Sequence, residues 1–302
     1  MAHVTFIHGI GNKPPSDALL SAWLTSLADN HGLELEAEGV TSSMAYWADV
    51  LYPEPLPRAS RRPRGSRRPL TGSDDVDTRW IDDLAAKVAT ARAAESVEPV
   101  SPVGPAERAG YEKTLPPSMA ERLLRTLLRD VHHYLSNVRY SPRPGVQHLI
   151  RDVIRERVVE TLQKGAARPG PHVVVSHSTG TVIAFDCLKR VQATPKVDAF
   201  VTIGSPLGLS EIQDQLKPEW TRSNGFPSER LEGRWLNVYD PRDIVVAAAD
   251  PKLANDYRRE DASVVIDLRE DHYGRWRHDI GKYLAGPKLR RELAGLLGLR
   301  WP

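Results

Sequence analysis

The sequence predicts an α/β fold with a mostly parallel central sheet, helices on both faces and a helical insertion. Three observations support this prediction. Short β-prone runs alternate with segments of helical apolar spacing near both ends of the chain. The run Val173–Val175 is continuously apolar, as in strands buried on both faces of a parallel sheet. Residues 52–145 differ in composition from their surroundings, and we interpret them as the insertion.

The composition limits the class of protein. The chain has 302 residues, of which 40% are hydrophobic and 26% are charged, enough for a core and a hydrated surface. No apolar run approaches the roughly 20 residues of a membrane span. No secretory signal precedes the first expected strand, so we expect a cytoplasmic protein. The net charge of +2 gives no reason to expect a nucleic-acid partner. The single cysteine, Cys187, excludes an internal disulfide and a multi-cysteine zinc site.

The first 50 residues are predicted to form a strand, a helix and a second strand. Val4–Ile7 is a β-prone run that stops at a glycine-containing turn. Apolar side chains at helical spacing follow from Leu19 to Leu27, and a second strand candidate covers about Leu33–Trp47. This order favours parallel pairing of the two strands.

Residues 52–145 break this pattern. Six arginines lie between Arg58 and Arg68, in a stretch rich in Pro and Ser that is typical of a solvated linker. Binding of an anionic partner is the alternative interpretation of this run. Helices are predicted at Trp80–Val97 and from Ser118 to about Leu135. We expect one domain over residues 1–302, with 52–145 as a cap-like insertion within it.

The α/β pattern resumes after the insertion. The expected elements are an amphipathic helix over Val146–Gln163, a strand at Val173–Val175, a helix over about Thr181–Val191, strands at Val197–Ile203, Trp235–Tyr239 and Ser263–Leu268, and helical residues from Ile280 to Leu297 that are broken at Gly286-Pro287.

The most informative motif is Ser176–Gly180, between an expected strand and an expected helix. It matches the nucleophile-elbow pattern G-x-S-x-G, except that Ser176 replaces the first glycine. The pattern holds the central residue, Ser178, on a sharp turn that exposes its hydroxyl. Because a serine hydroxyl is a poor nucleophile, it needs a base, and the base needs an orienting acid. An ordinary strand-to-helix turn is the alternative interpretation.

At this motif the chain resembles the α/β-hydrolase family, particularly its lipase and esterase branches. The resemblance covers about residues 2–50 and 146–300. It implies that an acid follows the serine after a later strand, and that a histidine follows the acid near the C-terminus.

The resemblance offers two candidates for the acid and two for the base. Asp243 precedes an apolar pair, as the acid commonly does in the family, and it is favoured over Asp240, which is able to cap the turn. His278 lies at a loop-to-helix junction of the kind where family members place the base. It is favoured over His272, which lies closer to the last strand.

The His-Gly turn after the first strand resembles one side of the family's oxyanion hole. The resemblance implies that the backbone amides of Ile10 and Thr179 are the donors to the oxyanion. His8, Gly9 and Ser205 are expected at the border of the substrate pocket. The more favoured role of the His8 side chain is to fix the turn.

The resemblance implies a serine hydrolase, esterase-like or lipase-like, that cleaves carboxylic esters or acyl lipids through an acyl-enzyme on Ser178. His278 and Asp243 would complete the triad. We expect a small-molecule or lipid ester as substrate, neither metal nor organic cofactor, and no nucleic acid; membrane contact is a secondary alternative. The competing hypothesis is a non-catalytic α/β-hydrolase-like module whose insertion binds a partner.

Overall fold

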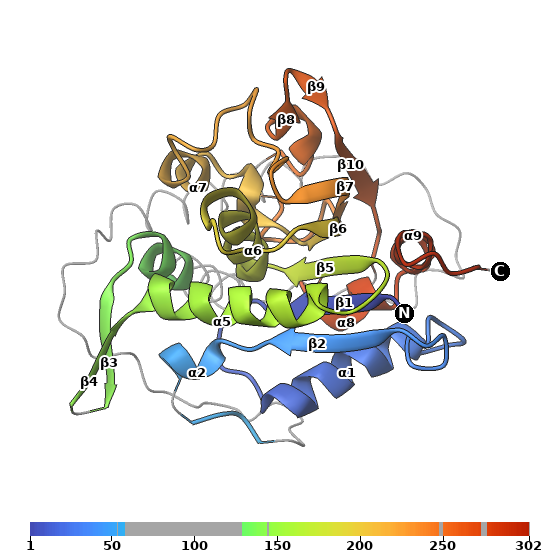
Figure 1. Cartoon of the computed structure of the whole chain (residues 1–302), viewed down its shortest axis with the longest axis horizontal. Coiled ribbons are helices and arrows are strands. Elements are labelled where there is room, and N and C mark those ends of the chain that lie inside the picture. Colours follow the sequence, from blue (N-terminus) through green and yellow to red (C-terminus); the bar gives the residue numbers. More distant parts are fainter. Residues whose placement is uncertain (53, 58–128, 144, 248–249, 273–276, 302) are drawn as a thin grey trace, which may run out of the picture.

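The structure of the chain, a computed structural model, describes residues 1–52, 54–57, 129–143, 145–247, 250–272 and 277–301. Its central sheet has six strands: β1 (His3–Ile7), β2 (Thr41–Ala45), β5 (His172–His177), β6 (Val197–Ile203), β7 (Leu231–Tyr239) and β10 (Val265–Arg269). The order across the sheet is β10–β7–β6–β5–β1–β2, and every neighbouring pair is parallel (Figure 1). The predicted α/β class with a parallel central sheet is confirmed.

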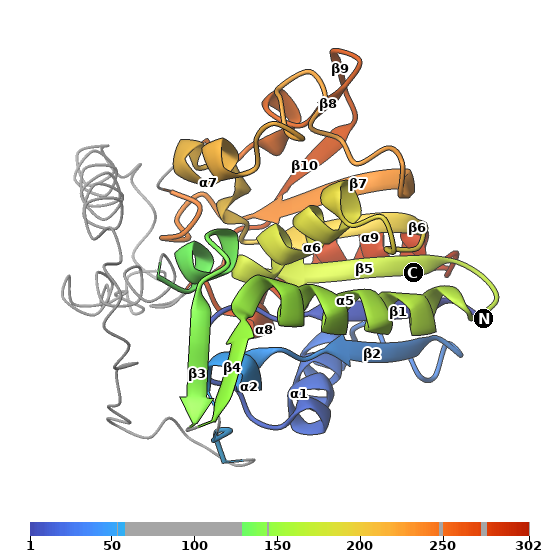
Figure 2. The ribbon, with the colours of Figure 1, turned by 60° about the vertical axis from the view of Figure 1, so that its left-hand side comes forward.

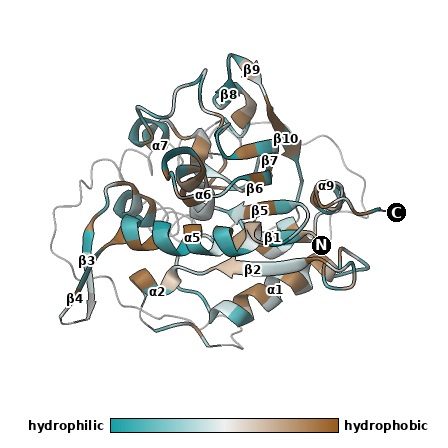
Figure 3. Cartoon of the chain, viewed as in Figure 1, coloured by the Kyte–Doolittle hydropathy of each residue, from teal (hydrophilic) through white to brown (hydrophobic). Residues whose placement is uncertain are grey.

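Helices cover both faces of this sheet (Figure 2). α5 (Ile150–Ala166) and α6 (Thr179–Arg190) share one hydrophobic cluster with the sheet, while α1 (Ser16–Ala28), α8 (Ile280–Leu284) and α9 (Pro287–Leu296) share the other. Along β5, Val174 belongs to the first cluster, and Val173 and Val175 belong to the second. Because both faces of this strand are covered, the whole run is apolar. Hydrophobic and hydrophilic residues alternate along α5, as expected for a helix with one face against the sheet (Figure 3). α6, by contrast, is buried on all sides from Thr179 to Leu188.

Several expected elements have different bounds: β7 begins at Leu231 and β10 at Val265, and two other elements differ more. The strand expected over Leu33–Trp47 is limited to β2, and turns occupy residues 35–39 before it. The helix expected from Val146 begins only at Ile150. Its first residues instead form β4 (Val146–Leu149), which pairs antiparallel with β3 (Arg139–Arg143) in a two-stranded ribbon. Pairing with a neighbouring strand therefore overrides the helical pattern of this segment.

Most of the expected insertion, including Arg58–Arg68 and the helix predicted at Trp80–Val97, lies outside the described residues. At its start, Tyr52 follows α2 (Ala48–Leu51). Near its end, residues 129–135 are helical, and Val131 and Tyr134 are buried in the same cluster as α5 and α6. The end of the insertion is thus part of the core.

Shorter elements complete the described chain: η2 (Pro206–Gly208), α7 (Ser210–Gln215), η3 (Leu253–Asn255), β8 (Arg258–Arg259) and β9 (Ala262–Ser263). Within the described ranges, no helix has the length and apolarity needed to cross a membrane.

The order of the strands reverses between β1 and β5. From β1 the chain proceeds outward to β2, whereas β5 lies on the other side of β1 and the following strands extend away from it. In open α/β sheets, ligands bind at the carboxyl ends of the strands at such a reversal. The two connections that meet there are residues 8–15, between β1 and α1, and Ser178, between β5 and α6.

Candidate active site

Ser178 occupies a strained turn between β5 and α6. Its φ of 55° and ψ of −131° lie in a region that side-chain-bearing residues rarely adopt. Neighbouring groups hold this conformation: the Ser178 amide donates to the Ile203 carbonyl at 3.0 Å, and the Thr181 hydroxyl donates to the Ser178 carbonyl at 2.7 Å. The backbone is therefore fixed by contacts on both sides of the serine.

Ser176 stands where the elbow pattern has its first glycine. The side chain is completely buried, and its hydroxyl donates to the Val201 carbonyl on β6 at 3.1 Å. A buried hydroxyl with a partner carries no penalty for an unmade hydrogen bond. The departure from the pattern is accommodated in this way.

Three side chains from separate connections form a continuous chain of hydrogen bonds. Ser178 Oγ lies 2.8 Å from His278 Nε2, and His278 Nδ1 lies 2.7 Å from Asp243 Oδ2. Because a carboxylate only accepts, the imidazole proton resides on Nδ1, which leaves Nε2 to accept from the serine hydroxyl. The structure thus brings together the three residues that the sequence singled out.

Asp243 is fully buried and accepts two further hydrogen bonds. The Val245 amide donates to Oδ1 at 2.9 Å, and the Tyr283 hydroxyl donates to Oδ2 at 2.8 Å. Burial, followed by the charge of Asp243, raises the pKa of Tyr283 well above its ordinary value, so the phenol remains a donor. Sequence reasoning missed Tyr283, which lies on α8 and is 40 residues from the carboxylate.

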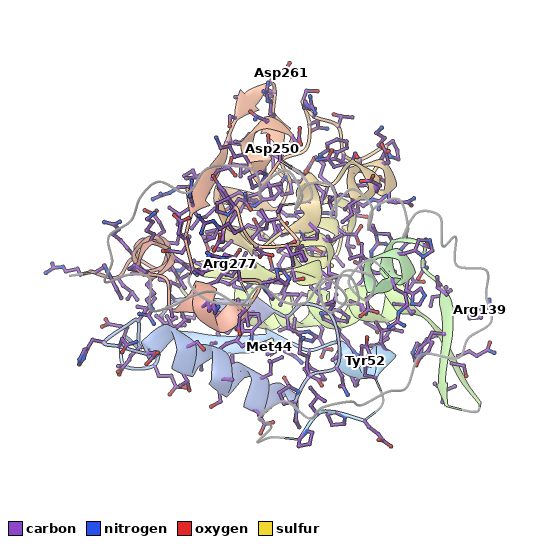
Figure 4. The ribbon with its side chains drawn as sticks, turned by 180° about the vertical axis from the view of Figure 1, so that it is seen from behind. Met44, Tyr52, Arg139, Asp250, Asp261 and Arg277 are labelled. Carbon is purple, nitrogen blue, oxygen red and sulfur yellow. The ribbon has the colours of Figure 1, made fainter. Side chains whose placement is uncertain are left out.

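Asp240 and His272, the alternative acid and base, have other partners. Asp240 accepts from the Arg242 and His272 amides, each at 2.8 Å, and from the Arg277 guanidinium at 3.2 Å. Arg277 is labelled in Figure 4. The His272 ring packs edge-on against Tyr283 at 4.2 Å, and its Nε2 has no partner among the described residues. The geometry therefore favours Asp243 and His278.

His177 lies between the strand and the proposed base. The centroids of the His177 and His278 rings are 4.7 Å apart, and the angle between the ring planes is 32°. Burial, and then the charge of His278, lowers the pKa of His177 well below its ordinary value. The ring is therefore neutral at pH 7, and it packs against His278 without competing for a proton.

The loop after β1 approaches Ser178 closely at Gly9. A Cβ on Gly9 would lie 2.7 Å from Ser178 Cβ, so only glycine fits here. Ile10 follows directly, and Thr179 begins α6, whose first amides have no partner within the helix. The two backbone segments expected to form an oxyanion hole thus meet at the serine.

The His8 side chain fixes the turn after β1, which is the role that the sequence favoured for it. It is completely buried; its Nδ1 donates to the Gly9 carbonyl at 2.8 Å, and its Nε2 accepts from the Trp47 amide at 3.0 Å. The His8 ring stacks on Trp47, with the ring centroids 4.7 Å apart and an angle of 13° between the ring planes. Burial lowers the pKa of His8 to about 3. The side chain fixes the turn, which leaves it no nitrogen to offer a substrate.

The turn after β6 reaches the elbow and the acid–base pair. Ser205 Oγ lies 2.7 Å from the Thr181 hydroxyl in the first turn of α6. Gly204, with a φ of 53°, lies so close that a Cβ would be 2.9 Å from Asp243 Oδ2 and 3.1 Å from His278 Nδ1. Sequence reasoning named Ser205 in this turn but missed the role of Gly204. The sequence feature that pointed to this role was a glycine directly after an expected strand.

Over the ranges that the structure describes, no group of three His, Cys, Asp or Glu side chains is placed to hold a metal ion.

Comparisons with known proteins add little to this geometry. No protein-family model matches the chain, and no curated protein matches it. Among solved structures, it is similar to the crystal structure of an uncharacterized protein from Pseudomonas aeruginosa, with 10% identity and a TM-score of 0.33. The alignment covers 90% of this chain and 40% of that one, so this chain spans less than half of that protein's length. A similarity at this level carries no argument about fold family or function.

Proposed function

We propose that the chain is a serine hydrolase of the α/β-hydrolase type that cleaves carboxylic ester or acyl-lipid bonds. One observation supports this proposal above the others: the chain of hydrogen bonds from Ser178 through His278 to Asp243, which starts on a strained strand-to-helix turn. Its position at the reversal of strand order is where the fold class binds ligands.

In this proposal Ser178 Oγ attacks the acyl carbonyl carbon while its proton passes to His278 Nε2. The amides of Ile10 and Thr179 stabilise the negative charge that develops on the carbonyl oxygen. The imidazolium then gives its proton to the leaving alkoxide, and the acyl-enzyme remains. Water repeats the sequence with the same base, releasing the carboxylic acid and restoring the hydroxyl.

Asp243 stabilises the imidazolium and holds the ring in the required tautomer. The hydrogen bonds from Tyr283 and Val245 fix the carboxylate while leaving Oδ2 in contact with His278. Neutral His177 adds no second positive charge beside the base.

The competing proposal, a binding module that acts through the insertion, has no observation in its favour, because most of the insertion lies outside the described residues. Labelling with a fluorophosphonate probe separates the two proposals, since the probe reacts with an activated serine. Wild-type protein should be labelled, Ser178→Ala should not, and Ser210→Ala, which removes an exposed hydroxyl on α7, should be labelled like wild type. Folded wild-type protein that fails to react would contradict the hydrolase proposal.

A further inference from the structure

The peptide group that joins Ile10 and Gly11 is held at both of its polar ends. The Ile10 carbonyl accepts a hydrogen bond from the Lys13 ammonium. The Gly11 amide donates to Asp130 Oδ2 at 3.3 Å, across 119 residues of sequence. A cation from the loop itself and a carboxylate from the helical residues 129–135 thus fix the plane of one peptide.

Asp130 is held in place by neighbours of its own. The residue is 1% exposed, and the hydroxyl of Tyr52, labelled in Figure 4, donates to Oδ2 at 3.0 Å. The Arg129 guanidinium lies 3.6 Å from Oδ1. Burial raises the pKa of the Asp130 carboxyl, while Arg129, Tyr52, Gly11 and Lys13 act in the opposite direction. These partners offset only part of the loss of water, because burial has the largest effect on the pKa and Oδ1 has no hydrogen-bond partner among the described residues.

Lys13 is the positive counterpart of this carboxylate. Burial lowers the pKa of the Lys13 ammonium to about 8, and Asp130 partly offsets the effect. The amine is therefore mostly protonated at pH 7 and able to donate to the Ile10 carbonyl. The Lys13 backbone is anchored separately, because its carbonyl accepts from the Leu56 amide at 2.9 Å. The Lys13 side chain therefore acts on the peptide between Ile10 and Gly11, through the Ile10 carbonyl, while the Lys13 backbone is held by Leu56.

The other parts of the loop have different anchors. The His8 ring fixes the first residue through Trp47, and Asn12 donates to the Glu54 carbonyl at 2.6 Å. Within the described residues, Lys13 and Asp130 hold the polar groups of the peptide between these anchors. That peptide directly follows the Ile10 amide, which is a proposed donor to the oxyanion.

We propose that Lys13 and Asp130 are positioning residues that hold the loop after β1 so that the Ile10 amide points at the oxyanion of the transition state. The inference rests on the proposed function. An oxyanion donor is effective only when it is oriented before the reaction. The pair touches no reacting atom and acts on the backbone of its neighbours. Its loss should therefore affect the transition state more than the ground state.

The experiment compares Lys13→Met, Asp130→Asn and Lys13→Arg in full-length protein with p-nitrophenyl butyrate. Lys13→Met should lower kcat about 100-fold, the scale of one lost oxyanion donor, with little change in KM. Affinity for an alkylboronic acid, which forms an anionic tetrahedral adduct on serine, should fall by a similar factor. Asp130→Asn keeps an acceptor for the Gly11 amide and should lose less, and Lys13→Arg should recover part of kcat.

Lys164→Met is the matched control, because it removes an exposed lysine paired with Glu160 on α5. It should leave kcat and boronate affinity unchanged. A Lys13→Met variant that matches this control in both measurements would overturn the inference while leaving the hydrolase proposal intact. The inference would also be overturned if kcat fell equally in Lys13→Met, Asp130→Asn and Lys13→Arg and if Lys13→Arg had lost its folded structure.

Amide hydrogen exchange gives a readout that needs no activity. Amides of residues 9–12 should exchange about 10-fold faster in Lys13→Met than in wild type, since the loss of a hydrogen bond from a charged group makes local opening of the loop easier. If wild-type protein proves inactive toward the fluorophosphonate, the proposed function fails on that result alone. Unchanged exchange in these residues would overturn the positioning role in either case.

Discussion

Two pairs of histidines lie at opposite ends of the same strands. At the carboxyl ends, His177 closes β5 and packs against His278. At the amino ends, His172 opens β5 and lies 5.5 Å from His3, the first residue of β1. Both pairs are buried, so burial alone does not distinguish them. The difference is the carboxylate of Asp243, which contacts His278.

The partners at the amino ends are hydroxyl groups. His3 Nδ1 lies 2.8 Å from Thr41 Oγ1, and its Nε2 lies 2.9 Å from Ser43 Oγ. His172 Nε2 lies 2.8 Å from Thr5 Oγ1. Burial lowers the pKa of both histidines to about 4, which holds them neutral. A buried histidine whose partners are hydroxyl groups has a structural role, whereas a histidine between a hydroxyl and a carboxylate is able to transfer a proton.

The largest expected difference between the two ends is in activity. His278→Gln should lower kcat for an ester about 10⁴-fold, because no other group takes the proton of Ser178. His172→Gln, the same substitution at the other end of the sheet, should leave kcat unchanged at pH 8. Steady-state kinetics on both variants checks the comparison, and an equal loss in both would remove its basis.

A methyl group added at the carboxyl ends of the strands should affect activity, whereas one added at the amino ends should affect stability. Gly9→Ala places a Cβ 2.7 Å from Ser178 Cβ and should lower kcat about 100-fold by displacing the nucleophile. Gly165→Ala places one 2.5 Å from His172 Nε2 and should lower the melting temperature with no effect on kcat. Measuring kcat and thermal unfolding on both proteins tests this; a fully active Gly9→Ala variant would contradict the close approach.

His3 and His172, the two histidines at the amino ends of the strands, should affect how the free energy of unfolding depends on pH. Folded-state pKa values near 4, below the ordinary 6.5, mean that the unfolded chain binds more protons between these values. Their contribution is complete above pH 6.5 and is lost as the pH falls toward 4. Urea unfolding of His172→Gln should therefore show a shallower decline over this range than wild type. Identical slopes would be inconsistent with a neutral buried ring.

The smallest expected effect concerns the support of the acid. Tyr283→Phe removes a hydrogen bond to Asp243 Oδ2 and should lower kcat/KM about 10-fold, within the range for hydrogen bonds to charged groups. Tyr257→Phe is the matched control, because that buried hydroxyl donates to the Leu207 carbonyl instead. It should lose stability without losing kcat/KM. Equal kinetics in the two variants would show that Tyr283 has only a packing role.

Local patterns were sufficient for much of the fold and for the turn that carries Ser178, whereas Asp243 and His278 were named through the resemblance to a family. The run Val173–Val175 and the motif after it predict a buried strand and a sharp turn from neighbouring residues alone. The N-terminal limit of α5 was missed, because pairing with β3, a tertiary contact, converts Val146–Leu149 into a strand.

Contacts between distant residues explain the parts of the site that the sequence did not predict. Tyr283 meets Asp243 from α8, and Asp130 reaches Gly11 across 119 residues. Nothing in the spacing of these residues marks the contact, since it exists only once the helices pack on the sheet. Asp243 was favoured over Asp240 only through the family resemblance, and the two carboxylates are separated by their partners in the fold, because Asp243 contacts His278 while Asp240 contacts His272 and Arg277.

The central claim is that Ser178 carries the acyl group between two half-reactions. Wild-type protein mixed with excess p-nitrophenyl butyrate and quenched in acid should yield, after digestion, a butyryl adduct on the peptide that contains Ser178. The adduct should be absent from Ser178→Ala. Ester turnover with an acyl group on another residue, or with an adduct that persists in Ser178→Ala, would contradict the account.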